Sequence, residues 1–432
     1  MMNEHELRRA IVGEMHLRRW PQLVTPAVVI QFVHTVDAAD RGLEQAAIND
    51  LPEGGRIERH DNPRHLSGWL APGVDFTVER HSEARTTTLF IDGGEIDAML
   101  APDAVALLKP GFRWASSLPG KVIRSTRVML VAGETEAAAM LRSIGFAEED
   151  LVSCYIGTRS AGPNRARIWS DFYLRPQGFG AILVAANGMP PGDLARTVQR
   201  LQELGNYRNL ALLGLPVARR GWAALDRIEN MLSDMLPAVA RPDITDDALL
   251  ERVTSLSMEL ISHATDCDYR MSATEAYARL VEERLADLNI EPCDGHLSLA
   301  DFTQRRFLPA VRTCAAHRRR AEQLAQRTTQ FVSLFRTRIE TRIENQNGRL
   351  LASMERNAAR QLRLQQVVEG LSVVAVSYYA LALLDKVLEG IKGHVKGLDV
   401  DIVSALLVPV ILLSVWLALH RMKRRILGPL GH

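Results

Sequence analysis

The sequence predicts an α/β domain at the N-terminus, built from a mixed sheet with flanking helices, and then an all-α region that ends in a two-span transmembrane hairpin. Three observations predict this. Residues 1–190 alternate between strand-like and helix-like periodicity, residues 191–366 have helical spacing alone, and the last seventy residues hold two long apolar segments. Strands that alternate with helices fold into a sheet with helices packed on it, and apolar segments of about 20 residues match the thickness of a membrane.

Strands of the predicted cytosolic domain, residues 1–190, are recognised as β-branched or alternating runs. The clearest is the run VVIQFV at residues 28–33. The predicted strands are residues 28–33, 74–81, 85–91, 122–131, 152–157, 165–174 and 179–185, and the predicted helices are residues 4–15, 38–49 and 135–144. Residues 74–81 and 85–91 are separated by a short turn, so we expect them to pair as neighbours.

Residues 191–297 are predicted to form a helical cytosolic region. Apolar spacing predicts helices at residues 194–213, 222–235, 246–263 and 273–288. Gly214 and Pro216 predict a helix end near residue 213, because glycine followed by proline is common just beyond a helix C-terminus. Ser298 is predicted to cap the next helix, with Asp301 three residues further on.

A long amphipathic helix is predicted for residues 298–366. After Pro309 the chain has no proline for a hundred residues, and apolar side chains recur at steps of three and four. These are Leu324, Phe331, Phe335, Ile339, Ile343, Leu350, Met354 and Leu362. Continued to Asp385, such a helix measures about 100 Å or more. Its apolar stripe must be covered by neighbouring helices of the chain or by other copies, so we expect a homo-oligomer.

Two membrane spans are predicted at residues 367–385 and 402–420. Basic side chains gather just before the first and just after the second, whereas the three lysines between the spans are offset by four acidic residues. Positive charge close to a span stays in the cytoplasm. Both termini are therefore expected to be cytoplasmic, with residues 386–401 as an external loop and residues 421–432 as a basic cytoplasmic tail.

Composition excludes several classes of protein. The chain has 52 basic and 51 acidic residues, so no charge excess favours binding to nucleic acid. Its four cysteines have no C-x-x-C spacing, which predicts reduced cytosolic thiols that form neither a zinc site nor a disulfide framework. The charged start predicts no cleavable signal peptide. Phosphate loops, nucleophile elbows and metalloprotease helices are missing from the sequence, so we expect no catalytic residues and no cofactor.

Two sets of residues remain as candidate sites. The first is a polar set near the N-terminus that could bind a divalent metal or could instead be a hydrogen-bonded network between helix and sheet. It consists of Glu14, His16, His34, His81 and Glu83, with Arg80 on the face opposite to His81 if both lie on one strand. The second set, Glu369, Ser372, Val376 and Tyr379, shares one face of the first span and could line a pore.

Several blocks of the sequence resemble a bacterial membrane-anchored family known as domain of unknown function 3422. The C-terminal block comprises residues 344–347, 350–354, 361–365 and 368–379, and the other blocks comprise residues 211–219, 170–172, 118–120 with Trp114, 79–83, and Glu14 with His16. The chain departs from the family pattern at residues 17–19 and at Ala84. The resemblance covers nearly the whole chain and implies a location in the bacterial inner membrane, but it implies no activity.

These patterns lead to two functional hypotheses. The first is a membrane-anchored scaffold or regulator that binds an unknown cytosolic protein partner, the lipid bilayer and other copies of itself. The alternative is a cation channel, because the layout of a cytosolic α/β domain, a long helix and two spans is similar to that of CorA-type magnesium channels. The Gly-Met-Asn motif of that family is absent, since Ala382, Leu383 and Leu384 occupy the equivalent place.

Overall fold

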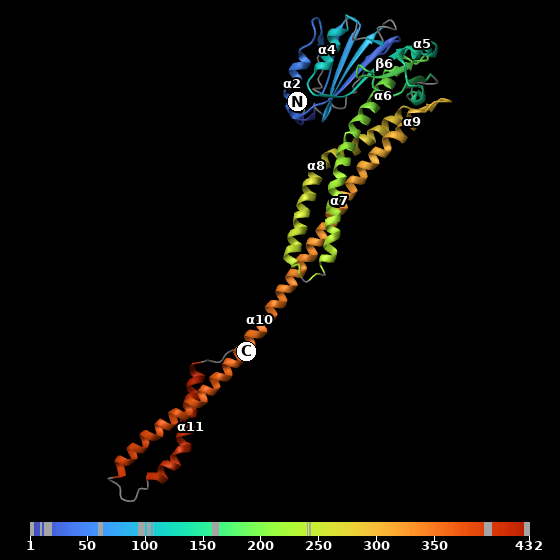
Figure 1. Ribbon diagram of the computed structural model, residues 1–432. Helices are drawn as coiled ribbons and strands as arrows, with labels where there is room; N and C mark the ends of the chain where they lie inside the picture. The colour runs from blue at the N-terminus through green and yellow to red at the C-terminus, as the bar shows by residue number, and fades with distance from the viewer. Residues whose placement is uncertain are drawn as a thin grey trace. The chain divides into compact units, whose positions relative to one another are not determined.

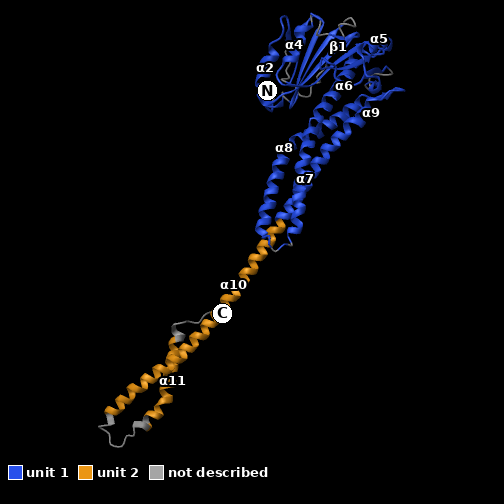
Figure 2. Ribbon diagram, in the orientation of Figure 1, with its two compact units in different colours: residues 1–332 blue, residues 333–432 orange. Residues whose placement is uncertain are grey.

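The computed structural model describes residues 4–8, 11–12, 20–58, 64–93, 100–101, 105–106, 108–157, 164–239, 241, 243–392 and 400–426. The chain divides into two compact units, residues 1–332 and residues 333–432 (Figure 2).

Ten strands within the described residues form one mixed sheet in the first unit (Figure 1). They are β1 (Ala27–Thr35), β2 (Arg56–Glu58), β3 (His65–Ala71), β4 (Val74–Arg80), β5 (Ala84–Asp92), β6 (Lys121–Val131), β7 (Val152–Ile156), β8 (Ala166–Ser170), β9 (Gly180–Ala185) and β10 (Glu291–Pro292). Their order is β10-β7-β8-β9-β6-β1-β5-β4-β3-β2, with β6 and β9 parallel and the other described pairs antiparallel. The predicted mixed sheet is confirmed.

Helices cover both faces of this sheet, and β1 shows why its sequence is an apolar run. Alternate side chains of a strand point to opposite faces. Val28, Ile30 and Phe32 pack with α2 (Ala38–Asn49), α4 (Lys109–Ser117) and α5 (Glu134–Ile144), while Ala27 and Val29 pack with α6 (Pro191–Leu212). A central strand that is buried on both faces reads as a continuous apolar stretch.

The remainder of the first unit is helical (Figure 1). Its helices are α6, α7 (Gly214–Ala238), α8 (Asp246–Asp287), the short α9 (Leu299–Phe302), a π-helical turn (Thr303–Phe307) and the start of α10 (Leu308–Lys392). Salt bridges join α7 to α8 through Arg227 and Glu259, and α8 to α10 through Glu275 and Arg318. The predicted cap is confirmed, since the Asp301 amide donates to Ser298 Oγ at 3.1 Å.

The predicted helix end near residue 213 is confirmed, since α6 ends at Leu212, but the next helix begins earlier than the predicted residue 222. The structure begins α7 at Gly214, directly after Leu213, and Pro216 lies in its first turn, where a missing N–H costs no helical hydrogen bond. Glycine serves packing here, because a Cβ at Gly214 would lie 2.2 Å from Thr274 Oγ1 on α8. The two helices predicted at 246–263 and 273–288 are one helix, α8, because buried Cys267 and Met271 continue its apolar spacing.

The second unit contains the end of α10 and α11 (Val400–Ile426), and the long predicted helix is confirmed. The Ser404 hydroxyl of α11 donates a hydrogen bond to the Asp385 carboxylate of α10. On α10, Ser377 is buried and its helix neighbours Val373 and Leu384 are half-buried. Most of the other apolar side chains of this unit are exposed. Both helices are long and apolar enough to cross a membrane, by length and composition.

Candidate functional site

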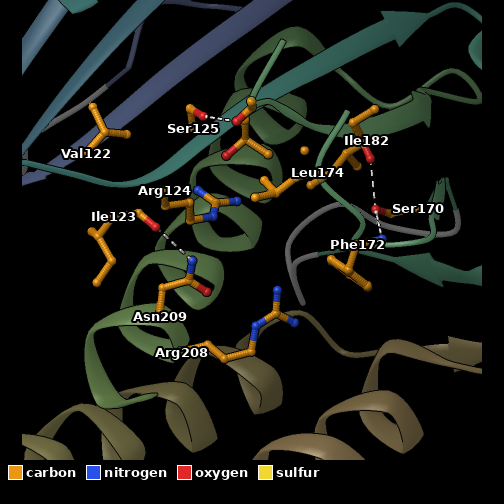
Figure 3. Close-up of a pocket in the computed structure, with 14 residues that line it drawn as sticks. Val122, Ile123, Arg124, Ser125, Ser170, Phe172, Leu174, Ile182, Arg208 and Asn209 are labelled. Carbon is orange, nitrogen blue, oxygen red and sulfur yellow. Dashed lines mark hydrogen bonds between the residues drawn. The ribbon is translucent and has the colours of Figure 1, made fainter. Parts of the chain in front are cut away.

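A pocket of about 260 Å³ opens at the edge of the sheet where β6 and β9 begin (Figure 3). Its walls come from the first residues of β6, the first residues of β9, the loop that follows β8, and the second half of α6. Two arginine side chains, Arg124 from β6 and Arg208 from α6, line it together with hydroxyl and amide groups. The pocket therefore combines a polar lining with two positive charges.

Arg124 is buried and held by neutral amide groups. Its Nη1 donates to Asn206 Oδ1 at 2.7 Å and to Gln31 Oε1 at 3.2 Å, and its Nη2 donates to Gln202 Oε1 at 2.6 Å. Gly205 makes room for this guanidinium, since a Cβ there would lie 2.6 Å from Nη2. The side chain is therefore fixed in position, and these three amide oxygens bring no negative charge to it.

Arg208 lies over two stacked aromatic rings. Its guanidinium carbon is 4.6 Å from the ring centre of Phe172 and 5.4 Å from that of Phe302, and the two rings are 4.6 Å apart. Cation–π contact of this kind orients a guanidinium without neutralising it. Its Nη1 atom is buried and has no hydrogen-bond acceptor within the part of the chain that the structure describes. Arg208 thus brings an unsatisfied, charged donor to the pocket.

The loop after β8 holds the aromatic wall of the pocket in place. Phe172 has a left-handed backbone with φ of 56°, which is uncommon for a bulky residue. Ser170 Oγ accepts from the Phe172 amide at 3.1 Å and donates to the Ala181 carbonyl at 2.8 Å. The buried Asp171 carboxylate accepts from the backbone amides of Tyr173 and Ala147. These bonds end the strand at Ser170, four residues before the predicted end, and fix Phe172 against Arg208.

The electrostatics of the pocket favour an anion. Burial lowers the pKa of Arg124 to about 9, with a further contribution from the charge of Arg208, and burial lowers the pKa of Arg208 to about 10. Both stay protonated at neutral pH. Among the described residues, no carboxylate forms a salt bridge with either guanidinium, although buried charges are normally paired. A phosphate or carboxylate group would supply the missing negative charge and accept from Arg208 Nη1.

Sequence reasoning missed both arginines. Arg124 lies inside the predicted strand 122–131, where a single charge passes for an exposed residue, and Arg208 lies inside a predicted helix. One signal was available: Gln31 is a polar residue within the apolar run of β1. A polar side chain at the centre of a buried strand needs a hydrogen-bonding partner, and here the partner is Arg124.

The predicted polar set divides over different places. Glu14 and His16 lie outside the described residues. His34 lies opposite Arg85 on the sheet face covered by α2 and α4, whereas His81 bonds Thr86 Oγ1 at 3.3 Å on the face covered by α6. The Glu83 carboxylate accepts two hydrogen bonds from Arg270 of α8, with Arg270 Nη2 2.5 Å from Oε2. The structure therefore does not bring His34, His81 and Glu83 together, and metal binding by the N-terminal residues stays a prediction.

The predicted pore residues lie on α10 in the second unit. Glu369 is half-buried, whereas Val376 and Tyr379 are 49% and 68% exposed. Ser372 is exposed too, and its hydroxyl donates to the Val368 carbonyl of its own helix at 2.8 Å. The side chains of Ser372, Val376 and Tyr379 are therefore available to lipid or to another chain.

Comparison with known proteins gives a family without an assigned activity. A family model with the description "Protein of unknown function (DUF3422)" matches residues 3–426. None of the curated proteins compared with the chain matches it.

Proposed function

Since this chain belongs to the DUF3422 family, whose description assigns no activity, we propose its function from its own residues: it is a membrane-anchored regulatory or scaffold protein whose N-terminal domain binds a small anion. The ligand class is a small molecule with a phosphate or carboxylate group. The observation that carries the proposal is a pair of arginines, the buried Arg124 and the half-buried Arg208, which line one pocket without a described carboxylate partner.

The position of the pocket supports a regulatory role. Gln202, Asn206 and Arg208 all belong to α6, and α6 continues almost directly into α7 of the helical bundle. Thr274 of α8 donates to the Ala211 carbonyl at the end of α6 at 2.9 Å. A ligand that fixes Arg208 therefore acts on a helix packed against α8, so binding is transmitted to the bundle as a change in the order or position of α6.

Membrane anchoring rests on the last hundred residues. The two helices that are long and apolar enough to cross a membrane bury 6% and 0% of their most apolar segments within the chain. Apolar surface of this extent is stable in lipid and unfavourable in water. With the charge asymmetry around the spans, this supports two spans in the bacterial inner membrane and cytoplasmic termini. A reporter active only in the cytoplasm should work when fused after His432; activity of a periplasmic reporter there would contradict this orientation.

Self-association is proposed for the middle of α10. Leu350, Met354 and Leu362 of the predicted stripe are 62%, 67% and 61% exposed, whereas Leu324 and Phe335 are buried. The stripe therefore leaves its exposed part for another protein surface. A second copy of the chain is the proposed partner, because the same apolar stripe on each copy can pair with itself along parallel helices.

Anion binding can be tested by thermal denaturation of the full-length chain in detergent, with phosphate or chloride at equal ionic strength. Phosphate is expected to raise the melting temperature of the wild type, because a ligand at 100 times its Kd stabilises by about 2.7 kcal/mol. The rise should be lost in Arg208→Met and kept in Arg113→Met, a matched change at an exposed arginine of α4. A wild type that phosphate does not stabilise, or an Arg208→Met variant that it still stabilises, would contradict the proposal.

The channel hypothesis remains the alternative. A pore would require copies of α10 to face one another through Ser372, Val376 and Tyr379, and the exposure of these residues is compatible with such contact. Cation flux into liposomes separates the hypotheses. We expect no flux from a scaffold, whereas flux that Glu369→Gln reduces would favour the channel.

A further inference from the structure

Three metal-ligating side chains meet inside the helical bundle, away from the anion pocket. His263 and Cys267 lie on α8, and His317 lies on α10. The Nε2 atoms of the two histidines are 3.2 Å apart, and Cys267 Sγ is 3.9 Å from His263 Nε2. All three ligand atoms lie within 4.8 Å of one another.

The helices are shaped to allow this approach. His263 and Cys267 are four residues apart, so they share one face of α8. On α7, a Cβ at Gly221 would lie 2.3 Å from His317 Nε2 and 2.9 Å from His263 Cε1. Any larger residue would push the histidines apart, and Gly221 therefore makes the cluster possible.

We propose that His263, Cys267 and His317 bind a zinc ion. Tetrahedral zinc with ordinary bond lengths places two nitrogen ligands about 3.3 Å apart and a nitrogen and a sulfur about 3.6 Å apart. The observed 3.2 Å and 3.9 Å differ from these values by a few tenths of an ångström. Small side-chain rotations are enough to bring all three atoms onto one ion.

The surroundings suit a soft, partly thiolate-ligated metal. Cys314 and Met271 pack with Cys267 in one buried cluster, and Cys314 lies one turn before His317 on α10. Sulfur and imidazole ligands select zinc and related transition metals over magnesium and calcium. Three protein ligands leave a fourth tetrahedral position for water or another ligand.

Such an ion would link two helices that are otherwise held by packing and salt bridges. His317 Nδ1 is buried and has no hydrogen-bond partner among the described residues. The histidine is therefore fixed mainly by the edge of Trp222, 5.9 Å away between ring centres, and by His263. A metal ion that holds α8 to α10 would stabilise the bundle directly, because structural zinc adds its binding free energy to folding.

The test uses the full-length, tag-free chain in detergent, stripped of metal and titrated with Co²⁺ as a spectroscopic substitute for zinc. The expected result is one Co²⁺ per chain, with a sulfur-to-cobalt charge-transfer band, the visible bands of tetrahedral cobalt, and displacement by Zn²⁺. A wild type that binds no stoichiometric metal, or binds it without the sulfur band, would overturn the proposal.

Variants decide which residues bind the ion. Cys267→Ser should abolish the charge-transfer band, and His263→Gln should weaken binding by at least about a hundredfold. Cys293→Ser and His296→Gln are matched controls outside the cluster and should leave the titration unchanged. Circular dichroism should confirm that each variant is folded. If Cys267→Ser does not fold, the test rests on His263→Gln, because His263 is only half-buried and its replacement disturbs the bundle less. An unchanged Co²⁺ affinity of His263→Gln would overturn the assignment.

Discussion

The burial of His34 makes the stability of the N-terminal domain depend on pH. His34 is 0% exposed, and its pKa is lowered from 6.5 to about 4, first by burial and then by the nearby charge of Arg85. The native state therefore keeps this imidazole neutral, while the unfolded chain binds a proton as the pH falls below 6.5. Stability that is present at neutral pH is lost progressively towards pH 4, because the unfolded state binds more protons in this window.

The magnitude follows from the two pKa values. Between pH 7 and pH 5 the free energy of unfolding should fall by about 2 kcal/mol on account of His34, and by about 3 kcal/mol once the pH is below both values. His34→Gln removes the titrating group, so its stability should change less over this range. Only the change in the free energy of unfolding between pH 7 and pH 5 is compared, so a difference in stability between the two proteins at pH 7 does not affect the result.

Urea denaturation of the full-length chain in detergent at pH 7 and pH 5, followed by tryptophan fluorescence, measures this difference. Trp114 and Trp169 belong to the same core cluster on the His34 side of the sheet, so they report on its unfolding. The exposed His296→Gln variant is the control and should keep the wild-type pH dependence. If the free energy of unfolding fell equally between pH 7 and pH 5 in wild type and in His34→Gln, the prediction would be refuted, and His34 would be accessible to protons in the native state.

Three further predictions concern packing and pairing. Gly205→Ala should displace the Arg124 guanidinium and lower the free energy of unfolding by about 1–3 kcal/mol through overpacking, partly offset by the higher helix propensity of alanine. The displaced arginine should also reduce the stabilisation by phosphate. Gly192→Ala on the same helix is the control and should have neither effect, because a Cβ there meets only Arg196 Nη1 at 3.9 Å. Glu83→Gln should lower stability by about 1–3 kcal/mol, because it leaves the half-buried Arg270 without its charged partner; an unchanged midpoint would show that the pair is dispensable. Leu350→Asp should dissociate the oligomer in detergent, measured by light scattering, whereas Arg349→Asp should act less strongly; a monomeric wild type would contradict self-association.

Much of the fold could be predicted because its signals are local. The apolar run of β1, the turn between β4 and β5, and the proline-free stretch of α10 each determine their element within a short window. Gly214 shows what a local window leaves out. Its sequence context correctly predicts the end of α6, but its close packing against Thr274 joins residues sixty positions apart.

The sites were harder to predict because they depend on convergence between distant segments. Arg124, Gln31 and Asn206 come from two strands and a helix, and no spacing in the sequence relates them. For the metal cluster, the spacing of His263 and Cys267 is visible in the sequence, but a helix predicted to end at residue 263 separates the two residues. In the structure α8 is continuous through this region, so His263 and Cys267 lie on the same face of one helix.

The position of the proposed anion-binding pocket also departs from a general rule for α/β proteins, in which ligands bind beyond the carboxyl ends of parallel strands. The pocket lies at the amino ends of β6 and β9. Beyond their carboxyl ends, the Glu134 carboxylate accepts from Arg167 at 2.6 Å and from the Tyr155 hydroxyl at 2.9 Å. This internal network occupies the place where a ligand would otherwise bind.

The most direct test of anion binding is to locate an anion in the protein. Crystals of the full-length chain grown with selenate, a phosphate-like anion whose selenium scatters anomalously, would reveal its position. We predict an anomalous peak in the pocket, within hydrogen-bonding distance of Arg208 Nη1 and close to Arg124. A pocket without a peak, with Arg208 instead paired to a carboxylate of the chain, would contradict it.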